Sequence, residues 1–334
     1  MHAPGRRLGW ALLFVLGLAF PFMTDNDYHL TVMATAYIFA ISTLGLNLIT
    51  GYTGQFNLAH AAFMAIGAYT VGILTVDHGW PFWPAFLMSV PVLVLFGLPL
   101  GWLSLRLKGH YFAIFTLCLG LIMFLLIEKW DGLTHGVVGI FGVAGPPSVG
   151  AINFDSPRAM YYLVFGFLVL SIWFMVRLVN SLVGRSFMAV RNGDALAEAL
   201  GLNLVRTKLL SFIISVVYAG LAGALYAGFV RFISPSLASE MHTFEMTMYM
   251  LVGGLGTVLG PLLGSLALPW LTQYMQFLAD YRFVVFGPLL ILIVIFMPHG
   301  IVGTWEMQRL RRAERKAAAG HVAGARADQE APHA

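Results

Sequence analysis

Long stretches without Asp, Glu, Lys or Arg constrain this sequence more than any other feature. They span 8–24, 30–76, 78–105, 109–127, 159–176, 209–230, 246–279 and 283–305. A helix that crosses a membrane needs about 20 predominantly apolar residues, and these stretches supply them repeatedly. Only 10% of all residues are charged, which is too few to cover a soluble protein of this size. We expect an all-α polytopic integral membrane protein rather than a soluble enzyme, a nucleic-acid-binding protein or a disordered chain.

The positions of the basic residues indicate how often the chain crosses the membrane. The run 30–76 is long enough for two helices separated at 51–54, and 246–279 forms either one long helix or a hairpin that turns at 253–256. With the hairpin, about ten transmembrane helices place fifteen of the 19 basic residues on one side, as the positive-inside rule requires of the cytoplasmic side. Nine crossings would leave the basic C-terminal tail outside.

The expected organisation is one transmembrane domain, 1–308, followed by a basic tail, 309–334, that we expect to be disordered. Both termini are expected in the cytoplasm. The first apolar run is expected to remain as an uncleaved helix, because no small-residue cleavage motif follows it. The outside loop 128–158 either connects two helices or docks an external partner, and the inside loop 181–208 is amphipathic.

Motifs for catalysis and for energy coupling are missing from the sequence. It contains no H-E-x-x-H, no G-x-S-x-G and no lysine directly after a glycine, as a P-loop requires. We expect no catalytic residue, no metal site and no cofactor in this chain. The apolar runs also lack the carboxylates and arginines that proton-coupled carriers use, and Glu240 and Glu245 lie only at the end of one run. Uphill transport would need energy from a partner.

Polar side chains gather around the expected break at 51–54. The candidates for a translocation path are Asn47, Tyr52, Gln55, Asn57 and His60. Non-helical backbone persists at membrane depth only where protein or a water-filled cavity provides hydrogen bonds, and transporters use such breaks at solute sites. A tight cytoplasmic turn with polar helix ends explains the same pattern, and the residues alone leave both interpretations open.

Glycines recur around the second expected break. Gly256, Gly260 and Gly264 have the small-xxx-small spacing that lets helices approach closely, and Gly253 precedes them. We predict close helix packing here rather than direct contact with solute. A dinucleotide loop is rejected, because the strand context that such a loop needs is missing.

The cytoplasmic loop contains a short predicted helix. Residues 194–200 can form two turns, with Asp194 as the N-terminal cap and Gly201 ending the helix. Such a helix, held between two membrane helices, can insert into a groove on a partner protein. It can equally lie on the membrane surface, with its arginines on lipid phosphate groups.

Four groups of motifs follow one another along the chain. They are GLNLITGYTGQ with NLAHAAF (45–63), RNGD with AEALGLN (191–203), AGLAGALY (219–226), and GGLGT with GP (253–261). Together, in this order, they resemble the LivM-type permeases, which are subunits of the high-affinity branched-chain amino acid ABC importer. The resemblance extends over about 30–305.

The resemblance implies an ABC importer permease fold in a bacterial inner membrane. The implied partners are a second homologous permease subunit, two ATPase subunits that bind ATP and Mg, and a periplasmic solute-binding protein, with membrane lipid around them and no nucleic acid. It also implies that the cytoplasmic loop contacts an ATPase through Arg191, Asp194, Ala197, Glu198, Ala199, Gly201 and Asn203. The alternatives are a permease for urea or short amides and a secondary carrier that works alone.

The charge distribution predicts where the C-terminal tail lies. A reporter fused after Arg312 should show a cytoplasmic location, because the ten-helix topology places the basic tail inside. Paired fusions to alkaline phosphatase and to green fluorescent protein measure this, with fusions at Asp131 in the outside loop as the control. Phosphatase activity after Arg312 would contradict the topology.

Overall fold

Apolar helices make up most of the structure. The computed structural model describes residues 4–24, 26–107, 109–148, 154, 156–274 and 300–304, with side chains for all of these except 4–13, 272 and 274. The long helices are α1 (Pro4–Met23), α2 (Asp27–Asn47), α3 (His60–Val76), α4 (Phe82–Ser104), α5 (His110–Lys129), α7 (Pro157–Val179), α10 (Leu204–Val230), α11 (Glu240–Gly253) and α12 (Leu259–Tyr274). Within the described residues, 5 helical stretches are long and apolar enough to cross a membrane, and shorter apolar helices accompany them. The all-α polytopic class is confirmed. The helix expected over 283–305 lies outside the described residues except for 300–304.

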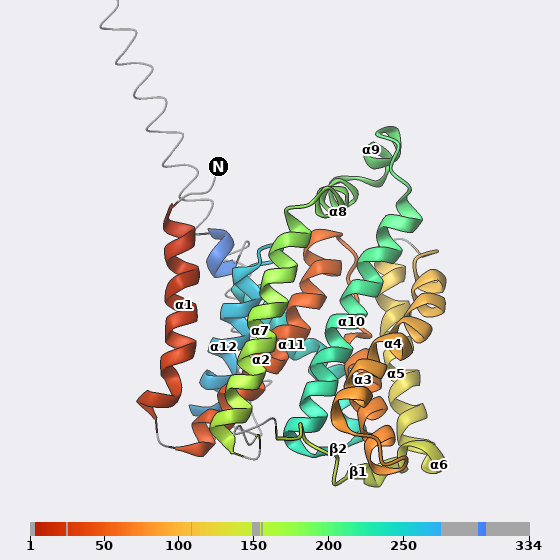
Figure 1. Ribbon diagram of the computed structural model, residues 1–334. Helices are drawn as coiled ribbons and strands as arrows, with labels where there is room; N and C mark the ends of the chain where they lie inside the picture. The colour runs from red at the N-terminus through yellow and green to blue at the C-terminus, as the bar shows by residue number, and fades with distance from the viewer. Residues whose placement is uncertain are drawn as a thin grey trace, which may run out of the picture.

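Short elements lie at the two ends of the helix bundle (Figure 1). At the end where α1 begins, α8 (Leu182–Asn192) and α9 (Asp194–Ala199) join α7 to α10. The opposite end holds α6 (Asp131–Thr134), the 3-10 turns η2 (Gly136–Val138) and η3 (Pro235–Ala238), and the strands β1 (Ile140–Phe141) and β2 (Phe232–Ile233). We refer to these as the α9 end and the β1 end.

The described part of the loop 128–158 is more ordered than the sequence indicates. β1 pairs with β2 antiparallel, with Ile140 opposite Ile233 and Phe141 opposite Phe232. The two Phe rings lie 4.3 Å apart between centroids. Each strand has only 2 residues, which is too short to show the alternation that marks a strand in a sequence. This part of the loop is therefore fixed against the residues that follow α10.

Glycines set the closest helix contacts in the core. A Cβ at Gly67 of α3 would overlap the backbone of Gly220 in α10, and a Cβ at Gly223 of α10 would overlap the backbone of Met64 in α3. The two helices are therefore antiparallel with their backbones in contact, which is the packing that small residues permit inside a membrane.

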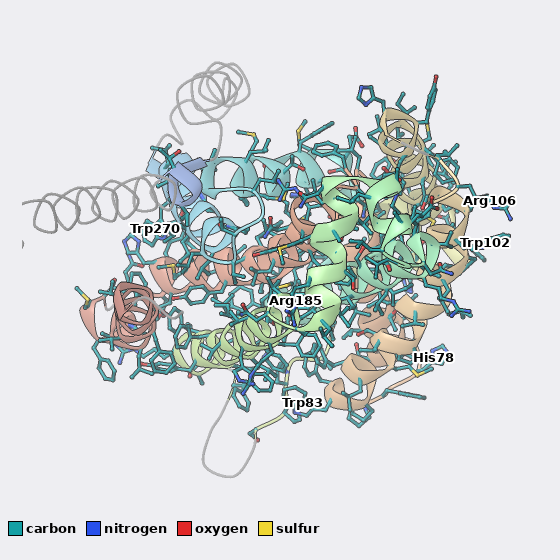
Figure 2. All side chains as sticks on the ribbon, turned by 90° about the horizontal axis from the view of Figure 1, so that it is seen from above. His78, Trp83, Trp102, Arg106, Arg185 and Trp270 are labelled. Atoms are coloured by element: carbon teal, nitrogen blue, oxygen red, sulfur yellow. The ribbon has the colours of Figure 1, made fainter. Side chains whose placement is uncertain are left out.

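The outward faces of α4, α5 and α7 are apolar and exposed. Leu95 in α4, Tyr111 in α5 and Leu170 in α7 have exposed fractions of 69%, 72% and 57%. At the α9 end of α4, the Arg106 guanidinium lies 3.8 Å from the ring centroid of Trp102, and Figure 2 shows both at the periphery of the bundle. Aromatic and basic side chains of this kind are typical of a membrane interface. These faces therefore meet lipid or another subunit.

α11 and α12 fold back on each other. A Cβ at Gly253 would overlap the backbone of Gly260, and a Cβ at Gly264 would overlap that of Tyr249. The two helices are therefore antiparallel, with a turn between Gly253 and Leu259. The described part of 246–279 has the form of a hairpin, and residues 275–279 lie outside the described part.

The contact between α3 and α10 can be tested with a valine at Gly223. Its side chain would collide with the backbone of α3, and overpacking of this kind costs about 1–3 kcal/mol. The thermal unfolding midpoint of the purified protein in detergent should fall. Gly166→Val is the matched control, because no atom lies within 4 Å of a Cβ at Gly166 of α7. Equal midpoints for the two variants would contradict the close contact.

Candidate functional site

The first break begins with a change of helix type. α2 continues directly into a π-helix, η1 (Leu48–Tyr52), and no regular structure follows until α3 begins at His60. The Thr53 N–H and hydroxyl both donate to the Leu48 carbonyl, and the Gln55 N–H donates to the Ile49 carbonyl at 3.0 Å. Short π-helical turns are often found at functional positions in helices.

The non-helical segment 53–59 lies beside the middle of a membrane helix. The Leu58 N–H donates to the hydroxyl of Thr116 in α5 at 3.1 Å, and Gly120 of α5 faces the backbone of Ala59. Thr116 and Gly120 belong to the central turns of α5, whose 20 residues are apolar enough to span a membrane. The position beside α5 favours a break at membrane depth over a cytoplasmic turn.

Asn47 joins the two breaks. Its side-chain amide donates from Nδ2 to the Thr257 carbonyl at 2.8 Å, and its Oδ1 accepts from the Gly256 N–H at 2.9 Å. Asn47 is fully buried. It therefore uses both ends of its amide to fasten the end of α2 to the turn between α11 and α12.

Arg191 of α8 meets the same junction from the α9 end of the bundle. Its Nη1 donates to the Gly51 carbonyl. The side chain also packs where a Cβ at Gly54 or at Gly256 would stand. Residues from η1, from the α11–α12 turn and from α8 thus come together here. The sequence shows a motif in each of these three segments, but no pattern in the sequence indicates that the segments are in contact.

Asn57 and His60 are buried beside the break. The Asn57 Oδ1 accepts from the Ala59 N–H at 3.0 Å, and the His60 Nε2 lies 2.8 Å from the Ser42 carbonyl, to which it donates. Among the described residues, Asn57 Nδ2, His60 Nδ1 and Ser42 Oγ find no hydrogen-bond partner. A buried polar atom without a partner costs about 1–3 kcal/mol. Three such atoms around one segment indicate a place that favours water or a polar group of a solute.

Two predicted path residues, Tyr52 and Gln55, and the four predicted packing glycines remain to be placed. Tyr52 is buried and Gln55 is half-buried. Gly253, Gly260 and Gly264 lie in the contact of α11 with α12, as described above. Gly256 instead lies in the turn with φ +75, a conformation that favours glycine.

α9 ends as expected but does not begin as expected. Gly201 has φ +81, its N–H donates to the Glu198 carbonyl at 2.9 Å, and the Leu202 N–H donates to the Ala197 carbonyl at 3.1 Å, which is the Schellman arrangement of a helix C-terminus. The prediction that Asp194 caps the helix is wrong. Gly193 occupies the cap position, and the Asp194 carboxylate instead pairs with Lys208 Nζ at 2.7 Å.

The outward surface of α9 carries exposed apolar side chains. Leu196 of α9 and Leu200, the residue that caps its C-terminus, have exposed fractions of 61% and 69%, whereas Ala197 is buried. Glu198 and Ala199 are exposed on the same short helix. Asn203 has a structural role, because its Oδ1 accepts from the Arg206 N–H at 3.0 Å and caps α10.

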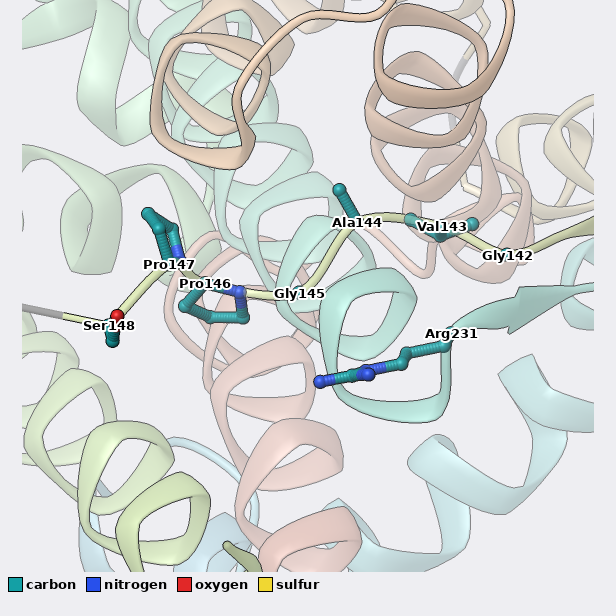
Figure 3. A pocket seen from close by; sticks show the side chains of 8 residues that line it. All are labelled: Gly142, Val143, Ala144, Gly145, Pro146, Pro147, Ser148 and Arg231. Atoms are coloured by element: carbon teal, nitrogen blue, oxygen red, sulfur yellow. The ribbon is translucent and has the colours of Figure 1, made fainter. Parts of the chain in front are cut away.

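The β1 end carries a cavity of about 430 Å³ that the sequence does not indicate. Its lining consists of Gly142–Ser148 and the side chain of Arg231 (Figure 3). Arg231 has φ 59, a left-handed conformation that is rare for a non-glycine residue. Its carbonyl accepts from the Gly142 and Val143 N–H groups. These bonds fold the outside loop around the end of α10.

Comparison with known proteins identifies the family. Residues 28–294 match the family described as branched-chain amino acid transport system / permease component. This chain belongs to that family. The LivM permease of the high-affinity branched-chain amino acid transport system of Escherichia coli K12 is 31% identical over 323 residues, which cover 89% of this chain and 75% of the relative. No solved structure matches the chain.

More distant relatives cover similar shares of the chain. The LivH permease of the same E. coli system is 24% identical over 294 residues, or 81% of this chain and 93% of the relative. The autoinducer 2 import system permease LsrC of Enterobacter sp. strain 638 is 28% identical over 296 residues, or 81% of this chain and 79% of the relative. The family resemblance read from the four motif groups is confirmed.

The link through Asn47 predicts a loss of stability on its removal. Asn47→Leu leaves the Gly256 N–H and the Thr257 carbonyl without their partner, at about 1 kcal/mol for each lost hydrogen bond. The thermal unfolding midpoint should therefore fall. Asn180→Ala is the control, because Asn180 is exposed at the end of α7. An Asn47→Leu variant as stable as the unmodified protein would contradict the bridging role.

Proposed function

We propose that this chain forms half of the translocation path of an ATP-driven importer for branched-chain amino acids. Its membership of a branched-chain amino acid permease family carries this proposal. The other half of the path comes from a second homologous permease subunit. The chain is a transporter component rather than an enzyme, and lies in the inner membrane as a multi-pass protein.

The energy comes from two ATPase subunits that dock at the α9 end, which is cytoplasmic in this proposal together with both termini. Leu196 and Leu200 support the docking, because α9 projects beyond the bundle (Figure 1) with both side chains exposed. Exposed apolar side chains on a short helix are typical of a segment that inserts into a groove on a partner. ATP and Mg are bound by the ATPase subunits, and this chain itself binds no cofactor.

Solute enters at the β1 end, from a periplasmic solute-binding protein. The outside loop 128–158 and the neighbouring Glu240 and Glu245 form the docking surface. The path then follows the break at 53–59, where Gln55, Asn57 and His60 lie. An apolar amino acid needs only a weakly polar path, which agrees with the scarcity of charges in the membrane helices. The binding protein selects the solute.

A different solute is the second candidate. LsrC, a relative by sequence, is named for the import of autoinducer 2, so family relatives carry names for more than one kind of solute. A permease for urea or short amides has the same architecture. A secondary carrier that works alone would transport without any ATPase subunit, which separates that class experimentally.

Uptake by the reconstituted importer tests the proposal. Proteoliposomes that contain both permease subunits, the ATPases and the binding protein should accumulate radiolabelled leucine only with ATP inside. Excess isoleucine should compete, and urea should not. Uptake by this chain without ATPases would indicate a secondary carrier, and competition by urea alone would indicate the amide permease.

Docking through α9 predicts the effect of a charge on its exposed surface. Leu200→Glu should lower ATPase association with the membrane complex at least tenfold, because it places a carboxylate in an apolar contact. Leu182→Glu is the control, because Leu182 is 74% exposed on α8 rather than α9. Co-purification of the ATPase measures association. Equal association for both variants would contradict docking through α9.

A further inference from the structure

The Arg191 side chain contacts both interrupted segments of the membrane domain, at Gly51 and Gly54 in the first and at Gly256 in the second. We propose that Arg191 transmits the movement of α8 and α9 to the break at 48–59 and to the turn at 254–257. The inference rests on the proposed function and adds a specific positioning residue to it. Arg191 acts through the backbone that it holds.

The position of Arg191 in the loop suits this role. It lies in the last turn of α8, and Gly193 alone separates α8 from α9. The ion pair between Asp194 and Lys208, at 2.7 Å, ties the start of α9 to α10. The Lys208 side chain is 9% exposed and the Asp194 side chain 34% exposed, so the lysine is shielded from water and the carboxylate only in part. A force on α9 therefore reaches the end of α8 directly.

The group that Arg191 holds is one that a helix end leaves without a partner. The last carbonyls of a helix have no N–H to accept from within the helix, and Gly51 lies in the last turn of η1. The end of a helix also carries partial negative charge, which favours a cation there. The Arg191 guanidinium supplies both the donor and the charge to the Gly51 carbonyl. Moving Arg191 away leaves that carbonyl unpaired.

The second segment is held by the same arrangement. Gly51 lies against the Gly256 backbone, and Gly256 against the Arg191 side chain. A side chain at either glycine would separate the three. Asn47 fastens Gly256 to the same helix end. Displacement of Arg191 therefore changes the contacts of both breaks together, which is what alternating access requires of a cytoplasmic signal.

The test compares Arg191→Gln with Arg185→Gln in the reconstituted importer. Arg185 is exposed on the same helix, α8 (labelled in Figure 2). For Arg191→Gln, leucine taken up per ATP hydrolysed should fall at least tenfold while ATPase association is unchanged. For Arg185→Gln the ratio should equal that of the unmodified importer. An unchanged ratio for Arg191→Gln would overturn the inference.

Hydrogen exchange provides a readout that a purely structural role would not change. In the unmodified importer, trapping with ATP and vanadate should change exchange at 48–59 and at 254–257 together, and Arg191→Gln should abolish this response. If that variant fails to assemble, the unmodified importer decides: a response confined to one segment, or absent from both, overturns the inference. Failure of the proposed function looks different, because the unmodified importer would then take up no leucine.

Discussion

Hydrogen bonding of a non-helical backbone inside the membrane is the constraint on which the rest of this structure depends. Segment 53–59 cannot bond to lipid, so the protein must provide its donors and acceptors. The side chain of Thr116 meets one N–H of the segment. Thr243 does the same for the Ala61 N–H, at the start of α3. α5 and α11 are therefore held against the break by polar bonds as well as by packing.

The same requirement explains why two distant breaks lie together. The turn between α11 and α12 also exposes backbone groups, and Asn47 pairs with two of them. Each interruption thus helps to satisfy the polar groups of the other. The glycines around them allow the backbones to come close enough for this. Unpaired polar atoms of Ser42, Asn57 and His60 lie beside the first of these interruptions.

Composition predicts the class of this protein because a membrane imposes so few structures on an apolar chain. Charge-free runs locate the helices, and Gly201 marks the end of α9 through its left-handed backbone. The pairing of β1 with β2 escapes prediction because two-residue strands carry no pattern. The prediction that Asp194 caps α9 is wrong because its carboxylate pairs with Lys208 of α10. Contacts such as Arg191 with Gly51 depend on packing that no local pattern records.

One helix connects the two faces of the molecule without interruption. α10 has 27 residues, about 40 Å at 1.5 Å per residue. Near its start, Lys208 pairs with Asp194 of α9, and its last residue is followed by Arg231, whose carbonyl accepts from the Gly142 and Val143 N–H groups. Because α10 is one uninterrupted helix, a tilt that moves its first turns inward moves its last turns outward. The segments at the α9 end and at the β1 end are thus attached to the two ends of one helix.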